Sequence, residues 1–185
     1  HSKVIEIIDD ADTSILSNIT TLKIRKSFTP TIGSSTNYTV SFSNALYNPH
    51  SGHNASAGGI LVSTGFKIGS SANEYFFDDD GTGNIRRYYL VGDVRTYADN
   101  SAGTIDYATG AIAVNALNIS SISNIRGLAS TVVELTVTPN SNDIVPLRNQ
   151  ILNIDVANSS ITVEVDTLVG GSSNAGIGYV TTSSY

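Results

Sequence analysis

The stretch Glu74-Tyr-Phe-Phe-Asp-Asp-Asp-Gly-Thr-Gly-Asn-Ile-Arg-Arg-Tyr-Tyr-Leu-Val91 decides the fold. Two β-prone aromatic runs flank a cluster of Asp and Gly residues, which is typical of a β-hairpin with a longer loop. After a polar link, the segment 105–114 repeats this pattern on a smaller scale, with Ala108-Thr109-Gly110 between two apolar runs. Two hairpins in succession predict an antiparallel sheet.

Alternation of apolar and polar residues extends this pattern along the rest of the chain. Further strands are expected at 20–28, 38–42, 60–68 and 132–138, and a further hairpin at 152–165. Short helical turns are expected at 3–10, 12–16 and 144–150. The sequence therefore predicts a mainly β fold, an antiparallel sandwich or barrel-like core of hairpins with a few short helices, with an α+β arrangement as the alternative.

The length of 185 residues fits one domain with a small appendage. We expect a single mainly β domain at 3–168 and a tail rich in Gly, Ser and Asn at 169–185. The chain contains no Met and begins His-Ser, so residues 1–2 resemble the remnant of a purification tag. The sequence is therefore expected to be a fragment of a longer protein.

Composition narrows the classes of function. Ten basic residues against sixteen acidic ones argue against a nucleic-acid partner, which would require a basic face. No apolar run is long enough to predict a membrane span or a membrane partner. The absence of Cys excludes disulfides and thiolate metal sites.

Two groups of residues are weak candidates for metal binding. Asp78 and Asp80 precede two glycines in a loop that offers the oxygen ligands Ca²⁺ prefers, but the glutamate that completes an EF-hand is missing. A turn that uses Asp and Gly for their local conformations is the simpler interpretation. His50 and His53 could share a metal ion, but the neighbouring sequence offers no third ligand. We therefore expect no metal site.

The sequence contains no recognisable catalytic constellation. Asp106, Glu164 and Asp166 are carboxylates on expected strands, and solvent exposure is their simplest interpretation. A Gly-x-Ser-x-Gly elbow is absent, and the Gly-rich tail lacks the Lys of a phosphate-binding loop. We therefore expect no catalytic residues, no enzyme activity, no cofactor and no small-molecule substrate.

Arg and Tyr are enriched where protein subunits meet, and this chain has nine tyrosines. Pairing with the many Asp residues is the alternative role for its arginines. The long loop at 44–59, the turn at 78–84 and the hairpin edges are the expected contact regions. The residues expected at a subunit interface are Tyr47, His50, His53, Asp79, Arg86, Tyr88 and Tyr89.

Several phrases in consistent order resemble one family. They are Leu46-Tyr-Asn-Pro-His50, Gly59-Ile-Leu-Val-Ser-Thr-Gly-Phe66, Asp78-Asp-Asp-Gly-Thr-Gly-Asn-Ile-Arg86, Gly103-Thr-Ile-Asp-Tyr-Ala-Thr-Gly110 and Arg148-Asn-Gln-Ile-Leu152. Together they resemble the carboxy-terminal part of the large baseplate wedge subunit of T4-type contractile-tailed bacteriophages, which is loosely related to baseplate-J-like proteins. The resemblance spans residues 4–167, and its phrases are strands and turns, not catalytic signatures.

This resemblance implies a structural role. A wedge subunit forms part of the baseplate ring around the tail hub, and its carboxy-terminal region joins subunits, often as paired copies. The expected location is then the virion tail baseplate, assembled in the cytoplasm of the bacterial host. The expected partners are a second copy of the chain and other baseplate subunits. The alternative is a carbohydrate-binding or adhesin β-module of a phage or bacterial surface protein.

Overall fold

A computed structural model describes residues 2–13, 15, 18–53, 59–142, 144 and 153–163. The chain divides into two compact units, His1–Asn149 and Gln150–Tyr185. This boundary lies before residue 169, where the sequence predicts a tail to begin. The predicted tail, the greater part of the predicted helical turn at 144–150 and two residues of the turn at 12–16 lie outside the described residues.

The described residues are 44% strand and 7% helix, which confirms the predicted mainly β fold. In chain order the elements are α1 (Ser2–Asp9), β1 (Ile24–Phe28), β2 (Ser35–Ser41), β3 (Val62–Ser63), β4 (Phe66–Ile68), β5 (Tyr75–Asp79), β6 (Asn84–Val91), β7 (Val94–Asp106), β8 (Ala111–Ile122), β9 (Val133–Val137) and the 3₁₀ turn η1 (Val156–Asn158). No helix among the described residues is both long and apolar enough to cross a membrane.

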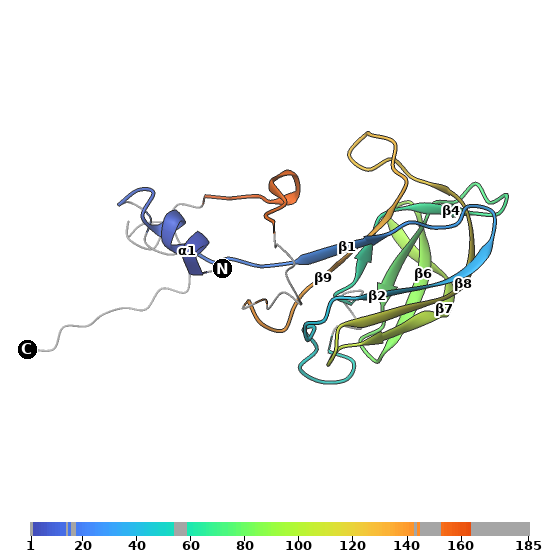
Figure 1. The fold of residues 1–185 in the computed structure, drawn as a ribbon, viewed down its shortest axis with the longest axis horizontal. Coiled ribbons are helices and arrows are strands. Elements are labelled where there is room, and N and C mark those ends of the chain that lie inside the picture. The colour runs from blue at the N-terminus through green and yellow to red at the C-terminus, as the bar shows by residue number, and fades with distance from the viewer. Residues whose placement is uncertain are drawn as a thin grey trace, which may run out of the picture. The chain divides into compact units, whose positions relative to one another are not determined.

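The larger sheet closes into a five-stranded antiparallel barrel (Figure 1). This sheet has six strands in the order β2-β8-β4-β5-β6-β7, and an additional pairing joins β7 back to β8, so that β2 pairs with β8 outside the closed ring of five. Strand β8 accommodates three partners. Strands β2 and β7 lie on opposite edges of its first part, with β2 continuing to Asn118, and β4 pairs with its last part. Residues 111–114 pair with β7 and also with β2, while residues 119–122 pair with β4. The two hairpins predicted from the sequence, β5–β6 and β7–β8, thus form most of the barrel wall.

A glycine permits the closest approach of β7 and β8. Gly103 lies opposite Val114, and a Cβ atom at position 103 would come within 2.2 Å of the carbonyl oxygen of Ala113. Any side chain there would push the two strands apart, so glycine is required where the barrel closes.

A second, three-stranded sheet has the order β1-β9-β3, with β1 and β9 side by side (Figure 1). The single strand predicted at 60–68 is wrong, because β3 joins this sheet and β4 joins the barrel. The change of sheet occurs at Thr64 and Gly65. The Thr64 hydroxyl accepts a 2.9 Å hydrogen bond from the Glu134 N–H, which fixes the chain where it leaves β9.

Alternate residues of the strands build a continuous apolar core. Its largest fully buried members include Phe66 and Phe77, whose ring centroids lie 4.8 Å apart. Other buried residues are Tyr38, Val40, Phe42, Leu46, Leu61, Ile85, Ala102, Ile105, Ile112, Val114, Leu117, Ile119, Val133, Leu135 and Val137. Each large side chain of this kind contributes about 1.5–3 kcal/mol by leaving water.

The hairpin predicted at 152–165 is not formed by the described residues 153–163. Residues Val156–Asn158 form a 3₁₀ turn, and residues 159–163 are not in a strand. The Asn158 side chain donates to the Asp155 carboxylate, and the Ser159 hydroxyl donates to the Asp155 carbonyl oxygen. Such local side-chain bonds compete with strand pairing. Ile161 and Val163 are exposed, so their alternation does not mark a buried face.

The segment 92–102 was expected to be a polar link, but most of it belongs to β7. Gly92 and Asp93 have φ values of 54° and 65°, as a two-residue type I′ turn requires. They connect Val91 directly to Val94, which makes β6 and β7 one long hairpin.

Candidate functional site

The three consecutive aspartates at the end of β5 serve three separate purposes. Successive residues of a strand face opposite sides of the sheet, so Asp78 and Asp79 point in opposite directions. Asp79 shares the core side with Phe77, and Asp78 shares the outer side with Phe76. Asp80 lies just beyond the strand, at the turn.

Asp79 fastens the chain segment that leads into β3. Its Oδ1 atom accepts hydrogen bonds from the N–H groups of Ile60 and Leu61, at 2.6 and 2.7 Å. Its Oδ2 atom accepts bonds from the Tyr107 hydroxyl at 2.6 Å and the Gly81 N–H at 3.3 Å. Burial, followed by the bond to Asp79, raises the pKa of Tyr107 far above its ordinary value of 10.0. Asp79 is therefore a fully buried structural residue.

Asp80 organises the β5–β6 turn. It accepts hydrogen bonds from the N–H and hydroxyl groups of Thr82 and from the N–H and side-chain amide of Asn84. Burial alone would raise the pKa of Asp80, but these bonds outweigh it and lower the pKa to about 2. This is the predicted turn that uses Asp for its local conformation.

The arrangement of these carboxylates does not suit a cation. Two arginines donate to the Asp78 oxygens, while backbone, hydroxyl and amide donors surround Asp79 and Asp80. Within the described part of the chain, no group of three or more His, Cys, Asp or Glu side chains could hold a metal ion.

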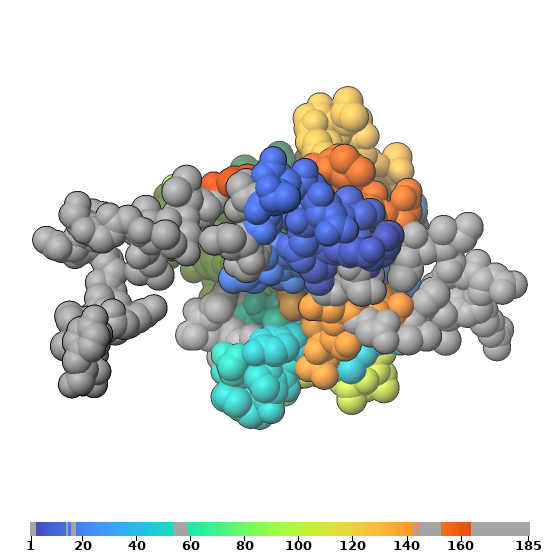
Figure 2. All heavy atoms as spheres, turned by 90° about the vertical axis from the view of Figure 1, so that its left-hand side faces the viewer, coloured from blue at the N-terminus to red at the C-terminus, as the bar shows by residue number. Residues whose placement is uncertain are grey.

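His50 and His53 do come together in the loop that follows β2. His53 Nδ1 lies 3.0 Å from His50 Nε2, and the Tyr47 ring packs edge-on against His53. The residues around this loop form part of the surface, cyan in Figure 2. The imidazoles thus hydrogen-bond to each other, and residues 54–58 of the same loop lie outside the described part.

The predicted interface residues divide into exposed and buried ones. Tyr47, His50 and His53 are exposed, and Tyr89 is half-buried. Asp79 and Tyr88 are buried, so the prediction that these two residues lie on an accessible surface is wrong. Asp79 is enclosed by its own hydrogen-bond donors, and Tyr88 lies beneath Arg95. Arg86 remains at the surface with most of its side chain covered.

The predicted carboxylate candidates for acid/base chemistry are not brought together. Asp106 is exposed and accepts hydrogen bonds from Ala108 and Thr109 of its own turn. The Thr109 hydroxyl and these backbone N–H groups lower the pKa of Asp106. Glu164 and Asp166 lie outside the described residues.

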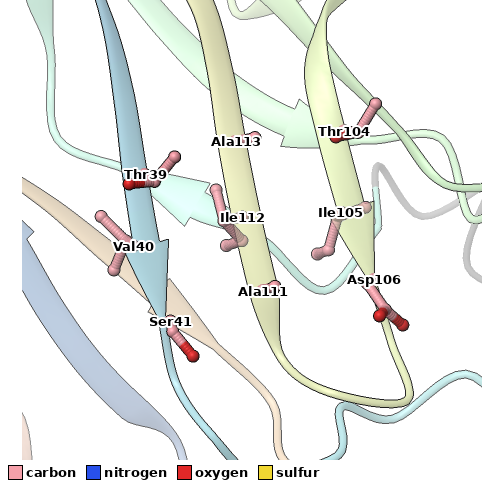
Figure 3. Close-up of a pocket in the computed structure, with 9 residues that line it drawn as sticks. All are labelled: Thr39, Val40, Ser41, Thr104, Ile105, Asp106, Ala111, Ile112 and Ala113. Carbon is pink, nitrogen blue, oxygen red and sulfur yellow. The ribbon is translucent and has the colours of Figure 1, made fainter.

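A hollow of about 400 Å³ lies on the wall formed by β2, β8 and β7 (Figure 3). Its residues include Thr39 on β2, Ala111 and Ala113 on β8, and Thr104 and Asp106 on β7. Small side chains produce this hollow. It contains none of the predicted metal or interface residues, and its one carboxylate is engaged in the turn described above.

A cluster of Arg and Tyr side chains covers Asp78 on the outer side of the hairpin. Asp78, Arg86, Tyr88, Arg95 and Tyr97 form what we call the Arg–Tyr face. Arg86 donates from Nε to Asp78 Oδ1 at 2.9 Å and from Nη2 to Oδ2 at 3.2 Å. Arg95 Nη1 and the Tyr97 hydroxyl donate to Oδ2 at 2.7 and 2.9 Å. The Asp78 side chain is only 1% exposed.

The same guanidinium groups lie over tyrosine rings. The Arg86 Cζ atom is 4.3 Å from the centroid of the Tyr97 ring, and the Arg95 Cζ atom is 4.7 Å from that of Tyr88. Burial raises the pKa of Tyr88, and burial with the bond to Asp78 raises the pKa of Tyr97. Both rings therefore stay neutral at physiological pH, and cation–π contact holds the two guanidinium groups in place.

Two further arginines lie beside carboxylates, Arg87 beside an Asp, as the pairing alternative predicts, and Arg126 beside a Glu. Arg87 lies 3.6 Å from Asp99, and Arg126 lies 3.7 Å from Glu134. Arg148 is outside the described residues.

The end of the β6–β7 hairpin exposes apolar side chains. Leu90 is 47% exposed and Val94 is 67% exposed, and Val91 and Tyr97 are exposed beside them. Among the described residues, Leu90 and Val91 pair only with β7, because the part of β6 that pairs with β5 ends at Tyr89. We did not predict Leu90, Val91, Val94 or Tyr97 as site residues. The sequence feature that could have predicted this hairpin end is Gly92-Asp93 between two valines, which favours a tight hairpin turn.

The fold and surface thus define a closed five-stranded antiparallel barrel with a flanking sheet and a partly apolar hairpin end. No family model, curated protein or solved structure matches this chain.

Proposed function

We propose that this chain is a structural assembly domain that binds other protein chains, and that it belongs to the baseplate of a contractile phage tail. One observation carries the first part of the proposal: the end of the β6–β7 hairpin exposes apolar side chains on both of its sides, Val91 and Val94 together on one side and Leu90 and Tyr97 on the other. Contiguous exposed apolar patches mark interaction sites more often than isolated ones do. The resemblance to baseplate wedge subunits, described from the sequence, supports the second part.

The contact with a second copy is assigned to the side of the hairpin that carries Val91 and Val94. These two residues pair across the turn, so their side chains lie on the same side of the hairpin. Leu90 and Arg95 form the next pair and lie on the other side. An isologous dimer could bury the valines of both copies without bringing the arginines of the two copies together.

Light scattering over a concentration series tests the self-association. The proposal predicts the mass of a dimer or a higher oligomer for the unaltered chain, and a monomer for the variant with Val91→Ser and Val94→Ser. A matched control replaces two exposed apolar residues elsewhere, Ile32→Ser and Leu128→Ser, and keeps the oligomer. A monomer at every concentration would contradict self-association. Glycan binding by that monomer would favour the alternative carbohydrate-binding module.

A further inference from the structure

We propose that the Arg–Tyr face docks an acidic segment of a different polypeptide. This inference rests on the assembly function proposed above and adds the chemistry of one partner. It concerns the outer side of the β6–β7 hairpin, which is separate from the valine side assigned to the second copy.

The strand register places the members of this face together. Asp78 pairs with Arg86 and Phe76 with Tyr88 across β5 and β6, while Tyr88 pairs with Tyr97 across β6 and β7. Directly opposed residues share one side of a sheet. Leu90 and Arg95 form the next pair on this same side of the sheet. They place an apolar side chain beside the exposed guanidinium group.

The charges of the face favour an anionic partner. Two guanidinium groups surround one carboxylate, which leaves a local excess of positive charge on a chain whose formal net charge is −6. Nearby Asp99 lies beside Arg87, and Asp93 occupies the turn. Arg95 and Tyr97 are the accessible members, with 36% and 37% exposure. Complementary charge across an interface selects partners and suppresses incorrect ones.

The face is also pre-organised for binding. Asp78 holds both guanidinium groups and the Tyr97 hydroxyl, and the tyrosine rings support the guanidinium planes. Less side-chain entropy is therefore lost when a carboxylate binds. Arg and Tyr in such settings are frequent hot spots of protein interfaces. The exposed Leu90 adds apolar contact, so the expected partner segment carries carboxylates next to apolar side chains.

A second copy of this chain is the less suitable occupant of this face. An isologous contact through it would set the Arg95 side chains of both copies against each other. Like charges placed together in an interface are unfavourable. The observations therefore favour a heterologous acidic partner.

A peptide array tests this inference with the full chain as the soluble analyte. The probes are short extended peptides in matched trios, identical except that their ionisable positions hold Glu, Gln or Lys. We expect the Glu peptides to bind about tenfold more tightly than the Gln peptides, a difference that added salt weakens, and the Lys peptides not to bind. Arg95→Gln and Leu90→Ser should each weaken binding of the Glu peptides by about fivefold or more.

The control is Arg126→Gln, which removes an exposed, ion-paired arginine outside the Arg–Tyr face and should leave binding unchanged. Thermal unfolding of each variant checks that the fold is kept. Equal binding of Glu and Gln peptides, equal losses in Arg95→Gln and Arg126→Gln, or no binding to any probe would overturn the inference. Binding of a neutral glycan that is lost in Arg95→Gln would overturn it as well. Self-association measured by light scattering would stand in any of these cases, so the two proposals fail separately.

Discussion

Asp78 and Arg86 lie opposite each other on β5 and β6 and form a two-pronged ion pair, 2.9 Å from Nε to Oδ1 and 3.2 Å from Nη2 to Oδ2. An Asp side chain is rarely buried unless it is paired, and Asp78 is buried on the outer side of the sheet. The side chains that cover it are those of the Arg–Tyr face. The side chains on the outer surface of the hairpin are therefore held in place by the buried carboxylate of Asp78.

The first prediction concerns that charge. Replacing Asp78 by Asn keeps the volume but leaves two guanidinium groups without their shared counter-charge. Removing one partner of a buried ion pair typically costs about 3–5 kcal/mol in the free energy of unfolding. Asp93→Asn, at the exposed turn where Asn tolerates a positive φ, is the matched control and should change the free energy by under about 0.5 kcal/mol. Urea unfolding measures both, and equal effects would contradict the role of Asp78.

The second prediction concerns the close approach of Gly59 to Asp79. A Cβ atom at position 59 would lie 1.9 Å from Asp79 Oδ1 and 2.5 Å from its carbonyl oxygen. Gly59→Ala should therefore destabilise the fold by more than the ~1–2 kcal/mol that a left-handed φ alone costs. Gly69→Ala has a left-handed φ too, with open space around it, and isolates the cost of φ. Urea unfolding should show the larger loss for Gly59→Ala, and equal losses would refute the close contact.

The third prediction is a pH dependence that comes from Asp80. Its pKa of about 2 in the folded chain lies below the ordinary value of 3.8, so the carboxylate stabilises the fold above pH 3.8. That contribution is lost as the pH falls from 3.8 through 2. Allowing for partial solvent exposure, it amounts to about 1 kcal/mol.

Asp80→Asn provides the comparison, because the amide does not ionise. The difference in unfolding free energy between the unaltered chain and this variant should be greatest near pH 6 and shrink towards pH 2. A difference that stays constant over this range would show that the charge of Asp80 does not stabilise the turn.

The fourth prediction concerns Tyr107 at alkaline pH. The pKa of the Tyr107 hydroxyl is raised in the folded chain. The protonated hydroxyl therefore stabilises the fold, and this contribution is fully present below pH 10.0. The effect is lost as the pH rises above 10. Tyr107→Phe should cost about 1–3 kcal/mol at neutral pH, because a buried Asp79 oxygen loses its best donor. The variant's unfolding free energy should then fall less steeply above pH 10 than that of the unaltered chain, and an equal slope would argue against this bond.

Much of the barrel follows from local patterns. The aromatic runs around Asp78–Asp80 identified one hairpin, and Ala108-Thr109-Gly110 identified the next. The change of sheet at Thr64 was not predictable, because the strands on both sides of it are β-prone and it is the contact with Glu134, far along the chain, that separates β3 from β4. The segment near Asn158 shows the converse, because residues 159–163 alternate in sequence and yet are not in a strand.

The candidate site was only partly predictable for the same reason. Arg86 and Tyr88 were predicted as interface residues from their residue type, but their burial depends on which side of the sheet each one faces. Asp78 and Asp79 are neighbours in sequence, yet one anchors the outer surface and the other the core. Tyr97 was overlooked because the polar residues around it concealed the strand β7.

Hydrogen–deuterium exchange at low and high protein concentration tests the central claim, that the end of the β6–β7 hairpin makes a protein contact. The account predicts that the amides around Val91 and Val94 become better protected as the chain associates, and that those around His50 and Leu128 do not. Association accompanied by protection elsewhere, with the hairpin unchanged, would contradict the account.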